Sequence, residues 1–170
     1  MSKKTYTRNT DSSFWKTPRL WCNCGSFALD TQTWVTPYDN DEYYTEEYRL
    51  SLMREMVDEG IDRQTILRVI LDMDQEALLY ACSWIEPVLP NEIVPEDRVV
   101  AYRLCLDEDL LERGIIDDDY HFRVRIDGVW FEKCGEEEIR FCGTEIDEEP
   151  WLTAPHLLYD SDIIYFRFKK

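Results

Sequence analysis

The sequence has little positive charge and lacks any long hydrophobic run. Its 170 residues include 19 lysines and arginines against 36 aspartates and glutamates, which gives a formal net charge of −17. A chain this acidic repels phosphate groups, so we expect neither nucleic acid nor an anionic membrane surface as a direct partner. No stretch approaches the roughly 18 apolar residues of a membrane span. The polar N-terminus has no apolar segment behind it to form a signal peptide, so we expect a cytoplasmic protein with reduced cysteines.

The acidic balance also indicates what the protein could bind. It permits a basic protein partner, and it permits a decoy that imitates the charge of DNA. The same charge could instead serve solubility alone. The composition alone does not distinguish between these roles.

The length and composition fit one folded domain. A chain of 170 residues can bury a substantial core, and an aromatic content of 14% is typical of folded proteins. We expect a flexible N-terminal arm over residues 1–20, ending in the aromatic pair Phe14 and Trp15. A single α+β domain would then occupy residues 21–170, with an acidic helical insert at about 41–86.

The first half of the chain has helical periodicity and the second half alternates. Helices are predicted over 24–30 and 41–59, followed by two more that Asp62 and Asp74 could cap. Strands are predicted over 98–104, 120–126, 129–134, 139–142 and 163–168. This order predicts N-terminal helices packed on a C-terminal antiparallel sheet.

Cys24 stands where the first helix should begin, with Asn23 as its cap. Unsatisfied N–H groups and the helix dipole stabilise a thiolate at such a position. The backbone N–H of Cys24 could also belong to an oxyanion hole. Cys24 is therefore a candidate nucleophile, although a buried cysteine can equally be a small hydrophobic core residue.

His121, one of only two histidines, lies on a predicted hairpin strand. Asp127-Gly128 is a strong two-residue turn signal, and the register it sets pairs Arg123 with Glu132. His121, Arg123, Glu132 and Cys134 should then share one side of the sheet. Nucleophile, base and orienting carboxylate would be Cys24, His121 and Glu132. A solvated polar face, with Arg123 simply paired to Glu132, is the competing interpretation.

Three segments together resemble a known group of bacterial and phage proteins. These are residues 23–29 (Asn-Cys-x-Ser-Phe-Ala-Leu), 119–123 (Asp-Tyr-His-Phe-Arg) and 127–135 (Asp-Gly-x-Trp-x-x-Lys-x-Gly). The group has a papain-like or NlpC-like cysteine peptidase fold. The resemblance covers about a quarter of the chain and implies Cys24 as nucleophile and His121 as base.

The sequence departs from this pattern at several positions. Gly25 stands where an aromatic residue is usual, and Phe131-Glu132 replaces Ser-His. A loosely matching stretch at 146–150 makes Asp147 a second candidate for the orienting role. These departures allow a protein that keeps the fold, has lost catalysis and binds a partner.

The sequence gives weaker support to a metal site or a phosphate-binding site. Cys22, Cys24, Cys134 and Cys142 could hold zinc, but their spacing is not that of a standard zinc module. The acidic runs 117–119 and 136–138 lack the pattern of a calcium loop, and no glycine-rich phosphate loop is present. We therefore expect no cofactor and no metal.

The sequence as a whole predicts a thiol-dependent hydrolase, a cysteine peptidase or amidase-like enzyme of bacterial or phage origin. Its substrate would be a peptide or protein. The alternative is a catalytically inactive acidic phage protein that binds a basic host or virion partner, with a DNA-mimic inhibitor as the extreme form. A phage protein of either kind would act in the host cytoplasm or the virion.

Overall fold

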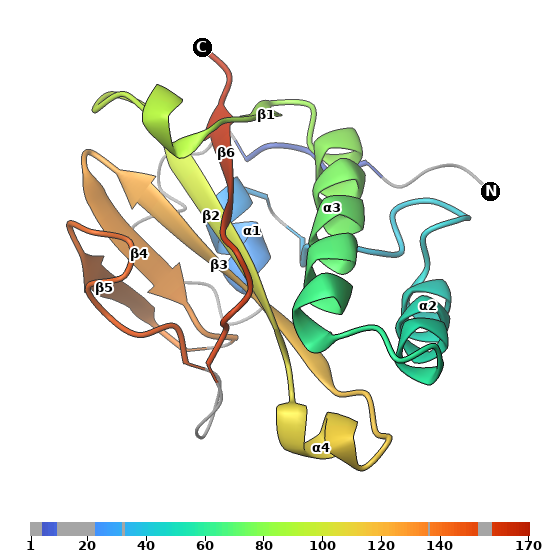
Figure 1. Ribbon diagram of the computed structural model, residues 1–170. Coiled ribbons are helices and arrows are strands. Elements are labelled where there is room, and N and C mark those ends of the chain that lie inside the picture. Colours follow the sequence, from blue (N-terminus) through green and yellow to red (C-terminus); the bar gives the residue numbers. More distant parts are fainter. Residues whose placement is uncertain (1–4, 10–22, 32, 136, 153–157) are drawn as a thin grey trace.

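Six strands form one antiparallel sheet in the computed structural model (Figure 1). They are β1 (Ile85–Pro87), β2 (Val99–Leu106), β3 (Asp118–Ile126), β4 (Val129–Lys133), β5 (Ile139–Gly143) and β6 (Ile164–Phe168). Their order across the sheet is β1-β6-β2-β3-β4-β5. The structure describes residues 5–9, 23–31, 33–135, 137–152 and 158–170.

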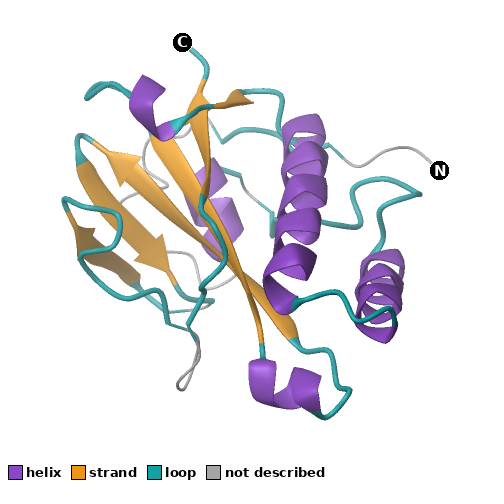
Figure 2. Ribbon diagram, in the orientation of Figure 1, coloured by secondary structure: helices purple, strands orange, loops and turns teal. Residues whose placement is uncertain are grey.

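The helices are α1 (Cys24–Leu29), α2 (Glu46–Asp58), α3 (Arg63–Ala81) and α4 (Glu108–Glu112), with a 3₁₀ turn at Pro90–Glu92. α1 packs on β3 and β4, α3 packs on β2 and β1, and α2 packs on α3. Figure 2 shows α3 lying along the sheet and α2 outside it. The protein is therefore an α+β domain in which the larger helices precede all six strands of the sheet.

The predicted helix boundaries were wrong in two places. α2 begins at Glu46 rather than residue 41, because the Thr45 side chain caps it by accepting from the Tyr48 N–H. Asp41 instead caps the preceding turn by accepting from the N–H groups of Tyr43 and Tyr44. α3 continues through residue 74, since Asp74 is fully buried inside it and does not cap a third helix.

Asp74 is the centre of a buried polar cluster. It accepts hydrogen bonds from Arg49 on α2 at 3.0 and 2.9 Å, and from Tyr102 on β2 at 2.6 Å. The Tyr44 hydroxyl donates to it as well, and Arg49 also pairs with Asp118 at the start of β3. Burial alone would lower the pKa of Arg49, but the adjacent Asp74 and Asp118 raise it above its usual value. The cluster ties α2 and α3 to the sheet.

The predicted register of the β3–β4 hairpin is confirmed from the turn to Arg123 and Glu132, where the pairing ends before it reaches His121 and Cys134. Ile126 pairs with Val129 and Arg123 with Glu132 across the turn. Asp127 and Gly128 both have positive φ, 50° and 79°, as a tight primed turn requires. The sequence analysis did not predict the short edge strand β1, which pairs with β6.

The two faces of the sheet have different covers. α1 and α3 cover one face, where Tyr102, Phe122 and Phe166 are fully buried. The other face packs against residues that follow β5, among them Trp151 and Tyr159. Because side chains alternate along a strand, Phe122 points to the helices and His121 points to the opposite cover.

The first described residues lie against the domain. Tyr6 is buried, its backbone N–H donates to the carbonyl of Ala81, and its hydroxyl accepts from the Thr36 N–H. These residues belong to the arm predicted over 1–20. The rest of that arm, including Phe14 and Trp15, lies outside the described residues.

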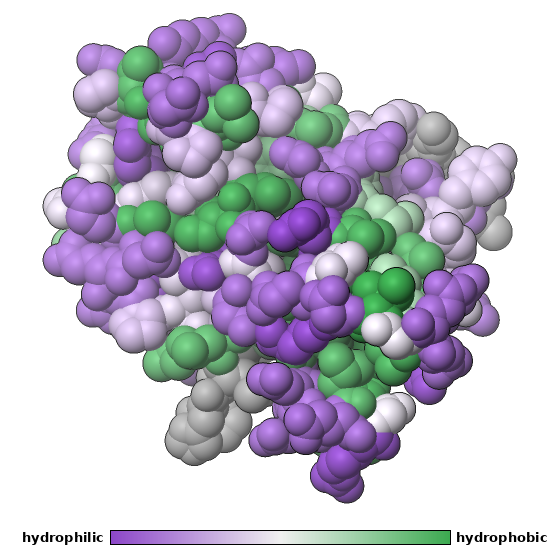
Figure 3. All heavy atoms as spheres, viewed as in Figure 1, coloured by the Kyte–Doolittle hydropathy of each residue, from purple (hydrophilic) through white to green (hydrophobic). Residues whose placement is uncertain are grey.

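Hydrophilic residues cover most of the face drawn in Figure 3, and hydrophobic residues surface in separate patches. None of the helices in the described part of the chain is both long and apolar enough to span a bilayer.

Gly25 lies close to Val35 and Phe122, so a side chain at this position would crowd both residues. A Cβ at this position would come 3.0 Å from the Val35 Cβ and 3.1 Å from Cε2 of Phe122. We expect Gly25→Ala to lower the free energy of unfolding by about 1–3 kcal/mol, because overpacking forces neighbours apart. Urea denaturation measures this. Gly60→Ala tests strain without crowding, since its positive φ of 75° is accompanied by no neighbour within 4 Å. Equal stability of Gly25→Ala and wild type would contradict the proposed crowding.

Candidate functional site

Cys24 is the first residue of α1, as its sequence context predicted. The Asn23 side chain caps the helix by accepting from the Ser26 N–H at 2.9 Å, and it donates to the carbonyl of Val35 at 2.8 Å. Ser26 donates its hydroxyl back to Asn23 at 2.8 Å. The buried residues Asn23 and Ser26 therefore fix the start of α1, and with it the position of the thiol.

Burial controls the ionisation of the Cys24 thiol. Its side chain is 8% exposed, and desolvation raises its pKa to about 12. Hydrogen bonds from the backbone of Phe122 and Gly25 act in the opposite direction, while the nearby charge of Asp119 adds to the increase. The thiol is therefore protonated at neutral pH in the free protein.

Cys24 meets β3 where that strand loses its partner on one side. β4 pairs with β3 only from Arg123 to Ile126. The hydrogen bond between the Cys24 sulfur and the Phe122 backbone places the thiol at this unpaired edge. His121 is the preceding residue of the same strand, and its side chain faces the other side of the sheet, toward Trp151 and Tyr159.

A pocket of about 610 Å³ opens at this point. Cys24 and His121 are both among the residues that line it, and they are 8% and 4% exposed. Trp34 and Leu152 contribute apolar walls and are about half exposed, at 50% and 52%. The remaining walls are Asn23, Asp119, Tyr120, Cys134, Gly135, Glu137 and Tyr159.

Glu132 orients the His121 ring from behind the pocket. Its Oε2 atom lies 2.9 Å from Nε2 of His121, and both side chains are buried. This contact leaves Nδ1 as the ring nitrogen not engaged by the carboxylate. Burial alone would raise the pKa of Glu132, but the hydrogen bond and charge of His121, with Arg140 and Arg123, hold it well below its usual value.

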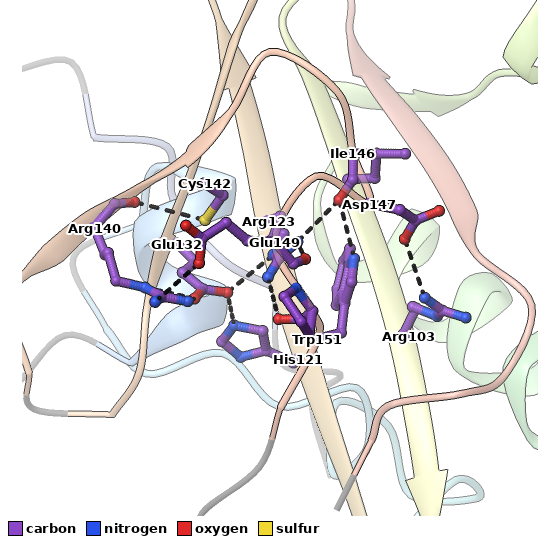
Figure 4. A network of polar contacts seen from close by, with 11 residues as sticks. Arg103, His121, Arg123, Glu132, Arg140, Cys142, Ile146, Asp147, Glu149 and Trp151 are labelled. Atoms are coloured by element: carbon purple, nitrogen blue, oxygen red, sulfur yellow. Dashed lines mark hydrogen bonds and ion pairs between the residues drawn. The ribbon is translucent and has the colours of Figure 1, made fainter.

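Arg123 and Arg140 complete the coordination of this carboxylate (Figure 4). Arg123 donates from Nε to Oε2 of Glu132 at 2.9 Å, and Arg140 donates from Nε to Oε1 at 3.0 Å. The Arg123–Glu132 ion pair of the competing interpretation is therefore present together with the His121 contact, but the predicted solvated face is wrong, because His121, Arg123 and Glu132 are all buried. Glu132 accepts from the guanidinium groups and from the imidazole at the same time.

Arg123 also fastens the segment that covers His121. Its guanidinium donates to the carbonyls of Ile146, Glu149 and Pro150, each at 2.9 Å, and lies 4.4 Å from the Trp151 ring. Trp151 in turn makes an edge contact with the His121 ring. Four of the five guanidinium N–H groups thereby find acceptors in a buried site, as a buried charge requires.

Tyr159 packs directly on the imidazole. The two rings are stacked with centroids 5.3 Å apart, and the Tyr159 hydroxyl donates to Asp119 at 2.7 Å. The sequence analysis missed Tyr159, Trp151 and Arg140. Trp151 and Tyr159 contact the His121 ring, and Arg140 contacts Glu132. All three are distant in sequence from His121, and no local pattern links them to it.

Asp147, the second candidate for the orienting role, lies elsewhere. Its side chain is 65% exposed and sits 3.4 Å from Arg103. Figure 4 shows it on the far side of Trp151 from His121. The structure therefore gives the orienting contact to Glu132.

A metal ion would find possible ligands here. His121, Glu132 and Cys134 each offer one ligand atom, and these three atoms lie within 4.8 Å of one another. Both oxygens of Glu132 already accept from guanidinium groups, however, and two positive charges beside the carboxylate disfavour a cation. Of the four cysteines considered for zinc, Cys22 lies outside the described residues, and Cys142 is buried against the Arg140 carbonyl.

No family model, curated protein or solved structure matched the chain.

Proposed function

We propose that the protein is a thiol-dependent hydrolase of papain-like or NlpC-like architecture, in which Cys24 attacks an amide carbonyl. The observation that carries the proposal is the shared pocket: Cys24 and His121 line it, and Glu132 holds His121 from behind. A nucleophile, a base and a group that orients the base make up the general pattern of covalent catalysis.

The architecture supports this assignment. α1 packs on β3, so the start of a helix and the middle of a strand supply the two reacting groups. The same arrangement is what the resemblance of residues 23–29, 119–123 and 127–135 implies.

In the first step the sulfur of Cys24 bonds to the carbonyl carbon while its proton passes to Nδ1 of His121. At pH 7 a thiol with a pKa of about 12 is ionised in roughly one molecule in 10⁵. Proton transfer must therefore accompany attack rather than precede it. The carbonyl oxygen gains negative charge, which the backbone N–H of Cys24 in the first turn of α1 would stabilise.

In the second step His121 returns the proton to the leaving amine, and the carbon–nitrogen bond breaks to leave a thioester on Cys24. Water then attacks the thioester, giving its proton to His121, and the acid product leaves with the thiol restored. Glu132 stays ionised throughout and stabilises the imidazolium that forms twice in each cycle. Asp119 fixes the Tyr159 ring against the imidazole.

The test is direct detection of the acyl-enzyme. The protein is incubated with a mixed peptide library, quenched in acid, and read by mass spectrometry for new peptide ends and for an acyl group on the residue 23–29 segment. We expect both in wild type and neither in Cys24→Ser. Cleavage that persists in Cys24→Ser, or an adduct on another cysteine, would contradict the assignment of the nucleophile.

A further inference from the structure

Two adjoining hollows lie on the helical insert. They have volumes of about 260 and 550 Å³ and share Tyr44 and Met73 as walls. Neither shares a residue with the pocket that contains Cys24. We call their combined lining the tyrosine surface: Asp41, Glu42, Tyr43, Tyr44, Thr45, Tyr48, Met73, Glu76, Ala77 and Tyr80.

Large aromatic side chains are unusually exposed on the tyrosine surface. Tyr43, Tyr48 and Tyr80 are 74%, 48% and 46% exposed. Tyrosine is enriched at protein interfaces because it offers a large apolar ring together with a polar tip. The side chains come from three places, the turn before α2, the first turn of α2 and the C-terminal part of α3.

The scaffold beneath these rings is rigid. Tyr44 is buried and donates its hydroxyl to Asp74 in the buried cluster, and Asp41 holds the turn through two backbone hydrogen bonds of 2.7 Å. Met73, Glu76, Ala77 and Tyr80 recur at helical spacing and so form one stripe along α3. A preformed surface loses little conformational entropy when it binds.

The charged residues that line the tyrosine surface are acidic. Asp41, Glu42 and Glu76 line the hollows, and the described residues that line them include no lysine or arginine. Glu46 and Glu47 follow in the first turn of α2. Carboxylates beside exposed aromatic rings provide both the ion-pair acceptors and the ring faces to which arginine and lysine side chains bind.

We propose that the tyrosine surface binds a basic segment of a partner protein, with arginine or lysine side chains entering the two hollows. This inference goes beyond the hydrolase chemistry and does not depend on Cys24. The net charge of −17 would steer such a segment toward the protein, while the hollows and their tyrosines select where it docks.

The test uses a fluorescein-labelled peptide of twelve residues in which arginine and lysine alternate with leucine and serine. Its affinity for the protein is measured by fluorescence anisotropy at increasing NaCl concentrations. We expect binding that weakens with salt, and at least fivefold weaker affinity in Tyr43→Ala/Tyr48→Ala. Glu76→Gln should weaken it further. Glu112→Gln on α4, with the same change of charge, should stay within twofold of wild type, as should Cys24→Ser.

Two outcomes would overturn the inference. The first is equal affinity for the wild type and the tyrosine variant, since binding would then reflect acidity spread over the whole surface. The second is a dimer of the wild type in sedimentation that Tyr43→Ala/Tyr48→Ala abolishes, because the surface would then join two copies of this chain. Circular dichroism confirms that the exposed substitutions leave the fold intact.

Discussion

Replacing Cys24 by serine or His121 by alanine should lower the rate of amide hydrolysis by about 10³-fold or more. Cys24→Ser removes the only group that the proposal allows to form the thioester. His121→Ala removes the acceptor for a thiol proton that would otherwise be lost only near pH 12. The two losses should not add, because both residues act in one step. The double variant should therefore be about as slow as either single variant. The measurement is the rate of turnover of a peptide that the library screen identifies as a substrate.

Cys142→Ser is the matched control for the thiol. Cys142 is as deeply buried and its pKa is likewise raised to about 12 by desolvation, but it lies outside the pocket. Its loss should leave turnover within a few-fold of wild type. Activity in Cys24→Ser equal to that of Cys142→Ser would remove Cys24 from the mechanism.

Asp74→Asn should lower the free energy of unfolding by about 3–5 kcal/mol, because it leaves the buried charge of Arg49 without its main partner. The Arg49 side chain is only 2% exposed, so water cannot replace the lost carboxylate. Tyr44 and Tyr102 would lose a charged acceptor at the same time. The midpoint of urea denaturation measures the change, with an unaltered slope as the sign that the unfolded state is unaffected.

Asp72→Asn tests whether the effect belongs to the cluster. Asp72 lies on the exposed side of the same helix, two residues earlier, and should change stability by less than about 0.5 kcal/mol. Similar changes in Asp72→Asn and Asp74→Asn would show that the buried cluster contributes nothing specific to stability.

Local signals made part of this structure predictable. The Asn23 cap sets the start of α1, and the turn at 127–128 sets a register in which Arg123 opposes Glu132. The prediction that His121 and Glu132 lie within reach of each other followed from that register alone. Each of these features is decided by residues within about a dozen positions of one another.

Contacts between distant segments could not be predicted in this way. Asp74 resembles a helix cap in sequence, yet Arg49 and Tyr102 outweigh that preference by giving its carboxylate a buried role inside α3. Tyr159 stacks on His121 only because the chain after β5 folds back over the sheet. The burial that raises the pKa of Cys24 likewise depends on tertiary packing, so a helix N-terminus alone suggested a more acidic thiol than the fold provides.

The most direct test of the account is the rate of iodoacetamide labelling at Cys24 between pH 5 and 10, read by peptide mass spectrometry in wild type and His121→Ala. If His121 accepts the thiol proton, Cys24 will label at pH 7 far faster than a thiol with a pKa of about 12 allows, and the substitution will slow it at least tenfold. If the labelling rate instead rises tenfold with each pH unit and is the same in both proteins, Cys24 and His121 do not act together, and the proposed hydrolase site is contradicted.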